Sequence, residues 1–318
     1  MRRRLTAEDI GLRMMTGGFG LLLVVIVAGI GVQLYRESTL SIAKFGWAFW
    51  ATETWDPVAG EFGALPFIWG TLYSSILALV ISTPIALGVA VFTSELSPAW
   101  LQRPLVFLTE LLAAIPSIVY GLWGIFVLVP VVRQFETSVP PALRAFPLFQ
   151  GPPLGVGMLA AAVVLAIMVI PFSSSVAREV LRSVPRAQRE AAYALGATRW
   201  EAIRAALFYG RTGIIGAVIL GFGRALGETM AVTMVIGNNP QVSWSVFAPQ
   251  YTMAAVIANE FTEATEELYL HALVEIGLVL FVITLAINLL SRALIWSVGR
   301  EGKRVRRTRP ALAAAEGA

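Results

Sequence analysis

Cysteine is absent from this 318-residue sequence, and histidine occurs once, at His271. Disulfide bonds, thiolate chemistry and the usual zinc clusters therefore have no ligands here. Lysine occurs only at Lys44 and Lys303, and neither lies in the GxxxxGK(S/T) pattern of a phosphate-binding loop. Aspartate is limited to Asp9 and Asp56, and no HExxH motif occurs. The sequence therefore predicts a chain that is not an enzyme and holds neither a metal nor ATP of its own.

Charge is also scarce, because only 14% of residues are charged while 57% are hydrophobic. A soluble domain has about 25% charged residues. Six apolar stretches have the length of about 20 residues that crosses a bilayer as a helix. They are 14–35, 62–94, 104–132, 154–177, 212–236 and 270–291. The sequence predicts an all-α, polytopic membrane protein with six transmembrane helices.

Basic residues are distributed unevenly over the segments that join these stretches. If the stretches cross the membrane in turn, nineteen of the 24 basic residues lie on the side of the N-terminus and four on the other. Because arginine and lysine concentrate in cytoplasmic loops, both termini are predicted to be cytoplasmic. The first stretch is too long for a signal peptide, so it is interpreted as a retained anchor. The predicted regions are a cytoplasmic N-terminus at 1–13, a first transmembrane helix at 14–35, a five-helix core at 64–296 and a basic cytoplasmic tail at 297–318.

The segment 178–210 is the longest predicted cytoplasmic connection. Pro185 suits the first turn of a helix, and Gly196 suits its end. Thr198 and Glu201 have the spacing of a capping box, which predicts a second short helix through Leu207. Two amphipathic helices joined at a glycine fit docking to a partner protein. Six arginines in the segment, with Arg211 directly after it, also fit the alternative of a helix resting on anionic lipid headgroups.

Charged residues also occur inside the apolar stretches. Arg224 lies at the midpoint of 212–236, and in a straight helix Glu228, four residues on, shares its face. Three glycines keep the nearby surface thin: Gly221, Gly223 and Gly227. The two charges either form an internal ion pair or line a path for an anion, since guanidinium binds tetrahedral oxyanions in a bidentate manner. Glu110, in 104–132, either reaches toward the cytoplasm or meets Arg224 or a charge on a partner.

Three sequence patterns resemble a known family of transporters. Glu190, Ala191 and Ala192, followed by Gly196, resemble the EAA signature of ABC-importer permeases, although Phe208 stands where that signature usually has proline. The run FGRALGETMAVTMVIGN at 222–238 and the run LLAAIPSIVYGLWGIF at 111–126 are similar to helices of the PstC family of phosphate ABC-transporter permeases. The resemblance extends over about 14–300.

The resemblance implies a MetI-like, type I permease core in a bacterial cytoplasmic (inner) membrane, forming half of a pathway for inorganic phosphate. It places Arg224 and Glu228 where such permeases carry charges needed for transport, and it assigns ATPase docking to the EAA segment. It further implies three partners and no nucleic acid. They are a homologous second permease (PstA-like), a pair of ATP-binding subunits (PstB-like) that hold ATP and magnesium, and a periplasmic phosphate-binding protein (PstS-like). A permease for another oxyanion or small solute, or an ion-coupled transporter, is the alternative; the latter should carry an inverted repeat, which is not evident.

Overall fold

The computed structural model describes the backbone of residues 7–315 and the side chains of residues 11–297. Within these residues the chain is helical, and the only strand-like pairs are isolated bridges, Asp56 with Glu61 and Gly237 with Gln250. Six helical segments of the described chain are long and apolar enough to cross a membrane, which confirms the predicted number. They are Gly11–Glu37, Leu65–Leu96, Ser117–Ser138, Met158–Ser183, Arg199–Leu226 and Glu267–Ser297.

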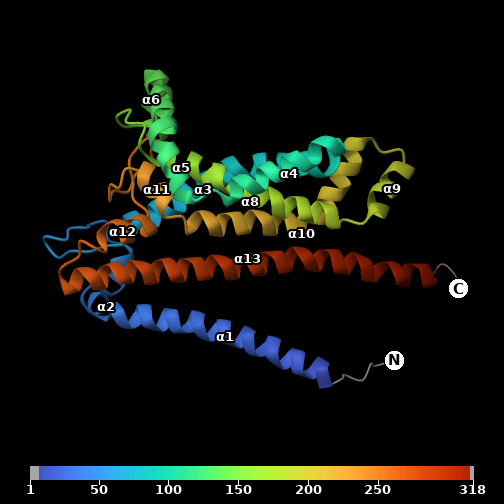
Figure 1. Ribbon diagram of the computed structural model, residues 1–318, viewed down its shortest axis with the longest axis horizontal. Coiled ribbons are helices and arrows are strands. Elements are labelled where there is room, and N and C mark those ends of the chain that lie inside the picture. Colours follow the sequence, from blue (N-terminus) through green and yellow to red (C-terminus); the bar gives the residue numbers. More distant parts are fainter. Residues whose placement is uncertain (1–6, 316–318) are drawn as a thin grey trace.

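The elements follow one another along the chain as shown in Figure 1. The α-helices are α1 (Ala7–Glu37), α2 (Thr39–Phe45), α3 (Leu65–Val91), α4 (Ala99–Ala114), α5 (Ser117–Trp123), α6 (Val129–Ser138), α7 (Pro141–Arg144), α8 (Met158–Ser183), α9 (Arg186–Ala194), α10 (Arg199–Leu226), α11 (Met230–Val235), α12 (Met253–Glu260) and α13 (Glu267–Ala315). Short 3-10 helices form at η1 (Gly46–Trp50) and η4 (Pro147–Phe149), and π-helical turns form at η2 (Phe92–Leu96) and η3 (Gly124–Leu128).

Helix α8 forms the centre of the bundle, between α3 and α10 (Figure 1). Its alanines at 160, 161 and 162 are fully buried. Small side chains let neighbouring helices approach closely, which is how helices commonly pack in membranes. The approach is closest at Gly221 of α10, where an added Cβ would lie 2.3 Å from Ser173 Oγ of α8.

The third predicted span, 104–132, is wrong as a single helix. Helix α4 ends at Ala114, and Ile115 and Pro116 have extended backbone conformations with ψ of 129° and 139°. Proline disfavours a helical conformation in the residue before it, so the chain breaks there. The hydroxyl of Tyr120 donates to the carbonyl of Leu112 across the break, at 2.8 Å. The membrane-length segment begins instead at Ser117, and α6 stands crosswise to α4 (Figure 1).

The fifth predicted span, 212–236, also differs from the structure. Helix α10 begins at Arg199, so the predicted short helix through Leu207 is the start of a 28-residue helix. It ends at Leu226, and α11 begins only at Met230. The interruption at Gly227, Glu228 and Thr229 therefore falls inside the predicted span.

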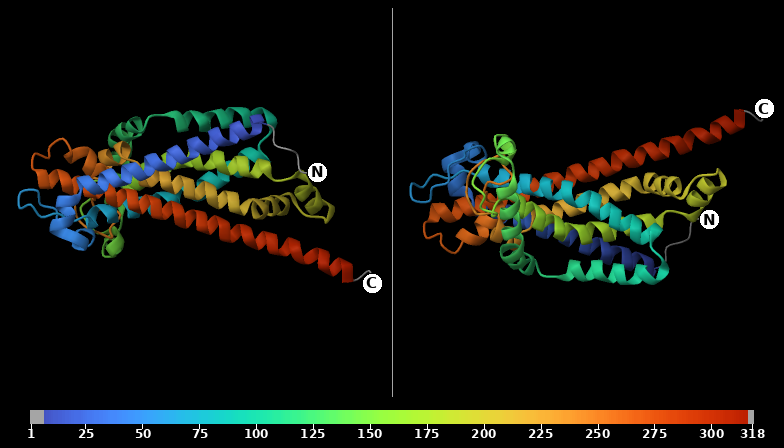
Figure 2. Two further views of the ribbon diagram at one scale, coloured as in Figure 1. Left: turned by 90° about the horizontal axis from the view of Figure 1, so that it is seen from below. Right: turned by 90° about the horizontal axis from the view of Figure 1, so that it is seen from above.

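The start of α1, helix α9 and the end of α13 lie at one end of the molecule, and α2 and α12 lie at the other (Figure 2). We call these the α9 end and the α12 end. Helix α13 extends to Ala315, so the predicted tail from residue 297 is helical up to that point. Residues 1–6 and 316–318, which belong to the predicted N-terminus and tail, are outside the described residues.

Candidate functional site

The turn after α9 has the hydrogen bonds of a Schellman motif. Gly196 has a φ of +82° and donates to the carbonyl of Tyr193 at 2.9 Å, while Ala197 donates to the carbonyl of Ala192 at 3.1 Å. A positive φ favours glycine, so the predicted helix end at Gly196 is confirmed. Pro185 is the N-cap residue of α9, one position before the first turn in which the sequence predicts it.

The capping box predicted at Thr198 is also present. Thr198 Oγ1 accepts a hydrogen bond from the Glu201 amide at 3.4 Å, and Glu201 Oε2 accepts one from the Thr198 amide at 2.7 Å. Each side chain thus satisfies a backbone donor that the first helical turn leaves free. Helix α10 continues through Phe208 without a break, although the EAA signature usually has proline there.

The outer face of this turn is unusually apolar. Glu190, Ala191 and Gly196 are exposed, and Ala192 is half-buried. Around them lie large exposed apolar side chains: Tyr193, Leu195, Trp200, Phe208 and Tyr209. A surface of this kind suits contact with a protein or with the lipid–water boundary. The role of Glu190, Ala191, Ala192 and Gly196 in docking stays a prediction.

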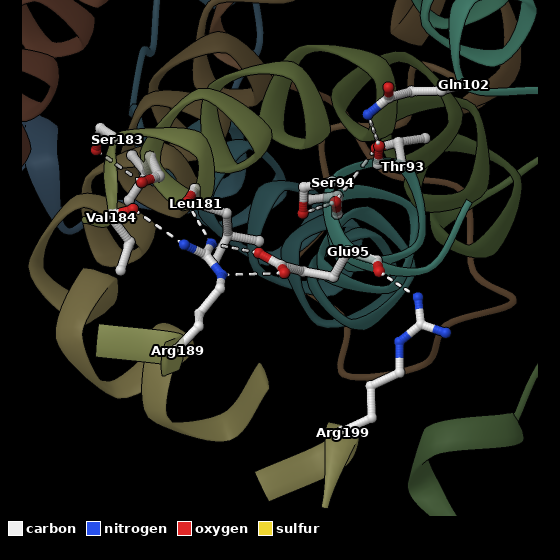
Figure 3. A network of polar contacts seen from close by, with 11 residues as sticks. Thr93, Ser94, Glu95, Gln102, Leu181, Ser183, Val184, Arg189 and Arg199 are labelled. Atoms are coloured by element: carbon white, nitrogen blue, oxygen red, sulfur yellow. Dashed lines mark hydrogen bonds and ion pairs between the residues drawn. The ribbon is translucent and has the colours of Figure 1, made fainter. Parts of the chain in front are cut away.

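The inner side of the turn is held by a polar network around Glu95 (Figure 3). Glu95 lies in η2, at the end of α3, and its carboxylate accepts two hydrogen bonds from the guanidinium of Arg189 in α9. Arg199, the first residue of α10, donates to the Glu95 carbonyl oxygen at 2.7 Å. The network thus joins the end of α3 to both arms of the turn.

Arg224 lies in the last turn of α10, at the end of the membrane-length segment Arg199–Leu226, so its predicted place at the midpoint of a span is wrong. Its side chain is exposed on the surface of the chain. Its guanidinium lies 5.7 Å from the ring centroid of Phe172 in α8. A cation is favourable in this position because the last carbonyls of a helix carry partial negative charge. No hydrogen bond or ion pair joins Arg224 to Glu228 in the described part of the chain.

Glu228 lies in the interruption between α10 and α11. Its Oε1 accepts a hydrogen bond from the amide of Ala231 at 3.4 Å, in the first turn of α11. The prediction that Arg224 and Glu228 share one helix face is therefore wrong, because α10 ends at Leu226. Both residues nevertheless lie at the same helix break, and their roles in transport stay predictions.

Glu110 forms an ion pair with Arg178 and has no contact with Arg224 within the described chain. Its Oε1 lies 3.4 Å from Arg178 Nη2 of α8, and the Glu110 side chain is 60% exposed while that of Arg178 is 9% exposed. An ion pair with one open partner contributes little to stability, about 0–1 kcal/mol. The pair directs Glu110 toward α8, and its role in the pathway stays a prediction.

Sequence reasoning missed Glu95, Arg189 and Arg178. Glu95 directly follows the second apolar stretch, and Arg189 directly precedes the EAA residues, but 94 positions separate the two. The sequence shows only that a charged residue stands at the end of an apolar stretch. It does not identify the residue with which that charge pairs.

Comparisons with known proteins agree with this arrangement. The family described as "Binding-protein-dependent transport system inner membrane component" matches residues 82–300. The "Phosphate transport system permease protein PstC" of Mesorhizobium japonicum is 44% identical over 305 residues, covering 93% of this chain and 92% of that protein. The protein of that name from Haemophilus influenzae is 47% identical and covers 88% and 90%. A "Probable phosphate transport system permease protein PstC" from Methanocaldococcus jannaschii is 38% identical and covers 79% and 82%.

The chain belongs to the family of binding-protein-dependent transport system inner-membrane components, in its PstC branch. A solved inward-facing form of the MetNI methionine ABC transporter shares its fold, with a TM-score of 0.54, 18% identity and coverage of 73% of this chain and 94% of that one. The permease is thus a multi-pass membrane protein with a MetI-like fold and works within an ABC transporter.

Proposed function

We propose that this chain is the transmembrane permease of an ATP-driven importer of inorganic phosphate and forms half of the translocation pathway. The proposal is supported by relatives named phosphate permeases that are 44–49% identical to the chain. The observation that carries the mechanism is an exposed arginine, Arg224, in the last turn of a membrane-length helix and directly before a helix break.

Physical reasoning favours a hydrated pathway beside this break. Non-helical backbone at membrane depth is tolerated only where it is buried in protein or faces water. Gly227 is exposed and Glu228 and Thr229 are half-buried, so this backbone is not sealed by the chain itself. An intramembrane arginine likewise needs water or a polar partner. A second permease subunit on this side would complete a polar pathway.

Phosphate is the cargo that Arg224 suits. Its guanidinium keeps its charge at any physiological pH and offers paired N–H donors to a tetrahedral oxyanion. Since Glu228 makes no ion pair with it within the described chain, the guanidinium stays available to an anion. Phosphate would exchange water for these contacts and be released on the other side, so binding there should be weak.

Energy for transport would enter at the α9 end. A pair of ATP-binding subunits, carrying ATP and magnesium, would dock on α9 and the start of α10 and close when ATP binds. We assign this end to the cytoplasm, and with it the start of α1 and the end of α13 (Figure 2). A periplasmic phosphate-binding protein would deliver cargo at the α12 end of this bacterial inner-membrane complex.

The decisive experiment is ATP-dependent uptake of radioactive phosphate by the assembled complex in vesicles. Arg224→Gln should reduce uptake about 100-fold, since a charge-assisted hydrogen bond contributes roughly 1.5–3 kcal/mol. Arg224→Lys should retain part of the activity, because it keeps the charge but not the planar donor pair. Arg103→Gln is the matched control, since Arg103 is an exposed arginine of α4.

Two outcomes would contradict the proposal. Normal uptake by Arg224→Gln would remove the arginine from the pathway. Equal transport of sulfate or molybdate by the wild-type complex would show that the cargo is not specifically phosphate.

A further inference from the structure

Glu95 and Arg189 form a fork-shaped ion pair at the α9 end. Arg189 Nε donates to Glu95 Oε2 at 3.1 Å, and Nη2 donates to Oε1. Both side chains are largely withdrawn from solvent, with 12% of Glu95 and 20% of Arg189 exposed. A bidentate contact of this kind adds directional specificity to its strength.

The arginine makes further contacts that tie it to α8. Arg189 Nη1 donates to the Val184 carbonyl at 3.0 Å, and Nη2 donates to the Leu181 carbonyl at 2.9 Å. These carbonyls belong to the end of α8, where helix carbonyls lack partners within the helix. Arg199 of α10 also donates to the Glu95 carbonyl. The ion pair therefore lies where the end of α3, the end of α8, helix α9 and the start of α10 come together (Figure 3).

Apart from its contacts with α10, helix α9 has little other hold on the bundle. It is nine residues long, and none of its residues is buried. A helix this short gains its stability from packing, and here no apolar side chain is covered enough to supply it. Arg189 and Glu190 are neighbours with different surroundings, because Arg189 reaches Glu95 while Glu190 is exposed. Helix α9 thus has one side for anchoring and one that is open.

The backbone at Glu95 is also shaped for this contact. The end of α3 widens into a π-helical turn, closed by a hydrogen bond from the Ser97 amide to the Phe92 carbonyl at 2.8 Å. An extra residue in a turn rotates the next residues of the helix by about 100°, which changes the direction of the Glu95 side chain. Single π-helical turns often occur at functional sites.

We propose that the Glu95–Arg189 ion pair is the mechanical link that carries movement of α9 into α3 during the transport cycle. This rests on the proposed function, in which a partner ATPase displaces α9. The two residues are positioning residues: they touch neither phosphate nor ATP. The pair stays closed throughout the cycle, so that α3 follows α9 in both directions.

The first test measures coupling in the assembled complex. Glu95→Gln should leave binding of the ATPase subunits and ATP hydrolysis in place, while phosphate transported per ATP hydrolysed falls about tenfold. Glu179→Gln is the matched control, since Glu179 is an exposed carboxylate in the last turns of α8 and should give the wild-type ratio. A wild-type ratio in Glu95→Gln would overturn the link.

The second test restores the link with a covalent bond, for which a chain without cysteine is well suited. The double variant Glu95→Cys with Arg189→Cys should be uncoupled, and a bifunctional thiol reagent that spans the pair should recover the transport ratio. A cross-linked complex that hydrolyses ATP without transporting phosphate would show that the pair must open, and the proposal would fail.

A third measurement does not depend on the cargo. Spin labels at Gly17→Cys in α1 and Gly88→Cys in α3 occupy open positions, with no atom within 4 Å of an added Cβ. ATP binding should change the distance between the labels, and Glu95→Gln should suppress that change. If the wild-type complex moves no phosphate, the proposed function fails while this distance still tests the link. An unchanged response in Glu95→Gln would refute the link alone.

Discussion

The two ends of the molecule are held together by different forces. At the α9 end, charged groups join segments far apart in sequence, as Glu95 does with Arg189 and Arg199. At the α12 end, aromatic rings do this, with Phe62 stacked on Tyr269 at a centroid distance of 5.3 Å and Trp55 edge-on to both Phe62 and Phe67 at 4.8 Å. Charged contacts depend on direction and ring packing depends on shape, so the ends should respond differently to the same kind of substitution.

Polar groups at the α12 end also differ from those at the α9 end in their burial and in their hydrogen-bond partners. Glu260, the last residue of α12, is half-buried and accepts hydrogen bonds from Trp55 Nε1 at 2.9 Å and Tyr269 OH at 2.6 Å. Several buried polar atoms of this end have no partner within the described residues: Ser41 Oγ, Glu136 Oε1, Gln250 Oε1, His271 Nδ1 and Glu275 Oε2. The α12 end is therefore held mainly by the packing of aromatic rings, and we call it the packed frame. At the α9 end, separate segments are joined by directional hydrogen bonds between charged groups.

The largest effect should come from filling the closest backbone approach of the frame. At Gly70 of α3, an added Cβ would lie 2.1 Å from the Tyr251 carbonyl oxygen. Gly70→Ala should destabilise the protein by about 3 kcal/mol or more, because a backbone atom must move and overpacking commonly costs about 1–3 kcal/mol. Thermal unfolding of the purified complex measures it.

Gly88→Ala provides the control on the same helix, since nothing lies within 4 Å of its added Cβ. It should be neutral or slightly stabilising, because alanine has the better helix propensity. Similar melting temperatures for the two variants would show that the frame is not tightly packed at Gly70.

The same substitution at a half-buried and at a buried carboxylate should affect the stability of the protein differently. Glu95→Gln should destabilise the protein by about 2 kcal/mol, below the 3–5 kcal/mol of a fully buried pair because Arg189 retains some solvent. Glu275→Gln should be neutral or stabilising by about 1 kcal/mol, since Glu275 is 3% exposed and forms no ion pair within the described chain. Denaturant unfolding of both variants compares the signs. An equal loss of stability in both would contradict the division between a charged and a packed end.

Each end has a glycine with positive φ, so the same substitution at both tests whether backbone strain alone affects the binding of the ATPase subunits. Gly196 has a φ of +82° and Gly46 a φ of +56°. Alanine at either position should cost about 1–2 kcal/mol, because L residues avoid left-handed backbone. Only Gly196→Ala should also weaken binding of the ATPase subunits, measured by pull-down from vesicles, because Gly196 lies in the proposed docking surface. If Gly46→Ala weakens that binding as strongly, general destabilisation explains both results.

Local signals were sufficient to predict part of this architecture. The number of spans follows from the length of the apolar stretches, and the turn at Gly196 and Thr198 follows from hydrogen bonds between residues close in sequence. The break at Gly227 could not be predicted because three neighbouring glycines fit a continuous packed helix equally well. The Pro116 break was signalled by its residue type, but the crosswise direction of α6 beyond it was not.

Contacts between residues far apart in the sequence could not be predicted from a single sequence. Glu110 pairs with Arg178, 68 positions away, and not with Arg224, which was one of the partners that the sequence suggested. The ion pair of Glu95 and Arg189 likewise depends on how α3, α8 and α9 pack. Such partners are fixed by tertiary geometry, which a hydropathy pattern does not encode.

The smallest predicted difference concerns the two threonine helix caps, one at each end. Thr198 caps α10 and is exposed, whereas Thr252 caps α12, accepts from the Ala255 amide at 3.2 Å and is 3% exposed. Thr198→Ala should cost about 0.5–1 kcal/mol, since water replaces the lost acceptor, and Thr252→Ala about 2 kcal/mol, since water cannot. Hydrogen exchange at the amides of Glu201 and Ala255 measures each cap locally, and serine at either position should retain protection. If the exposed cap proved the more costly one to remove, the α9 end would depend on its turn more than on the Glu95 network. Comparing the free-energy cost of removing each threonine cap therefore tests whether charge or local capping holds the segment on which the ATPase subunits would act.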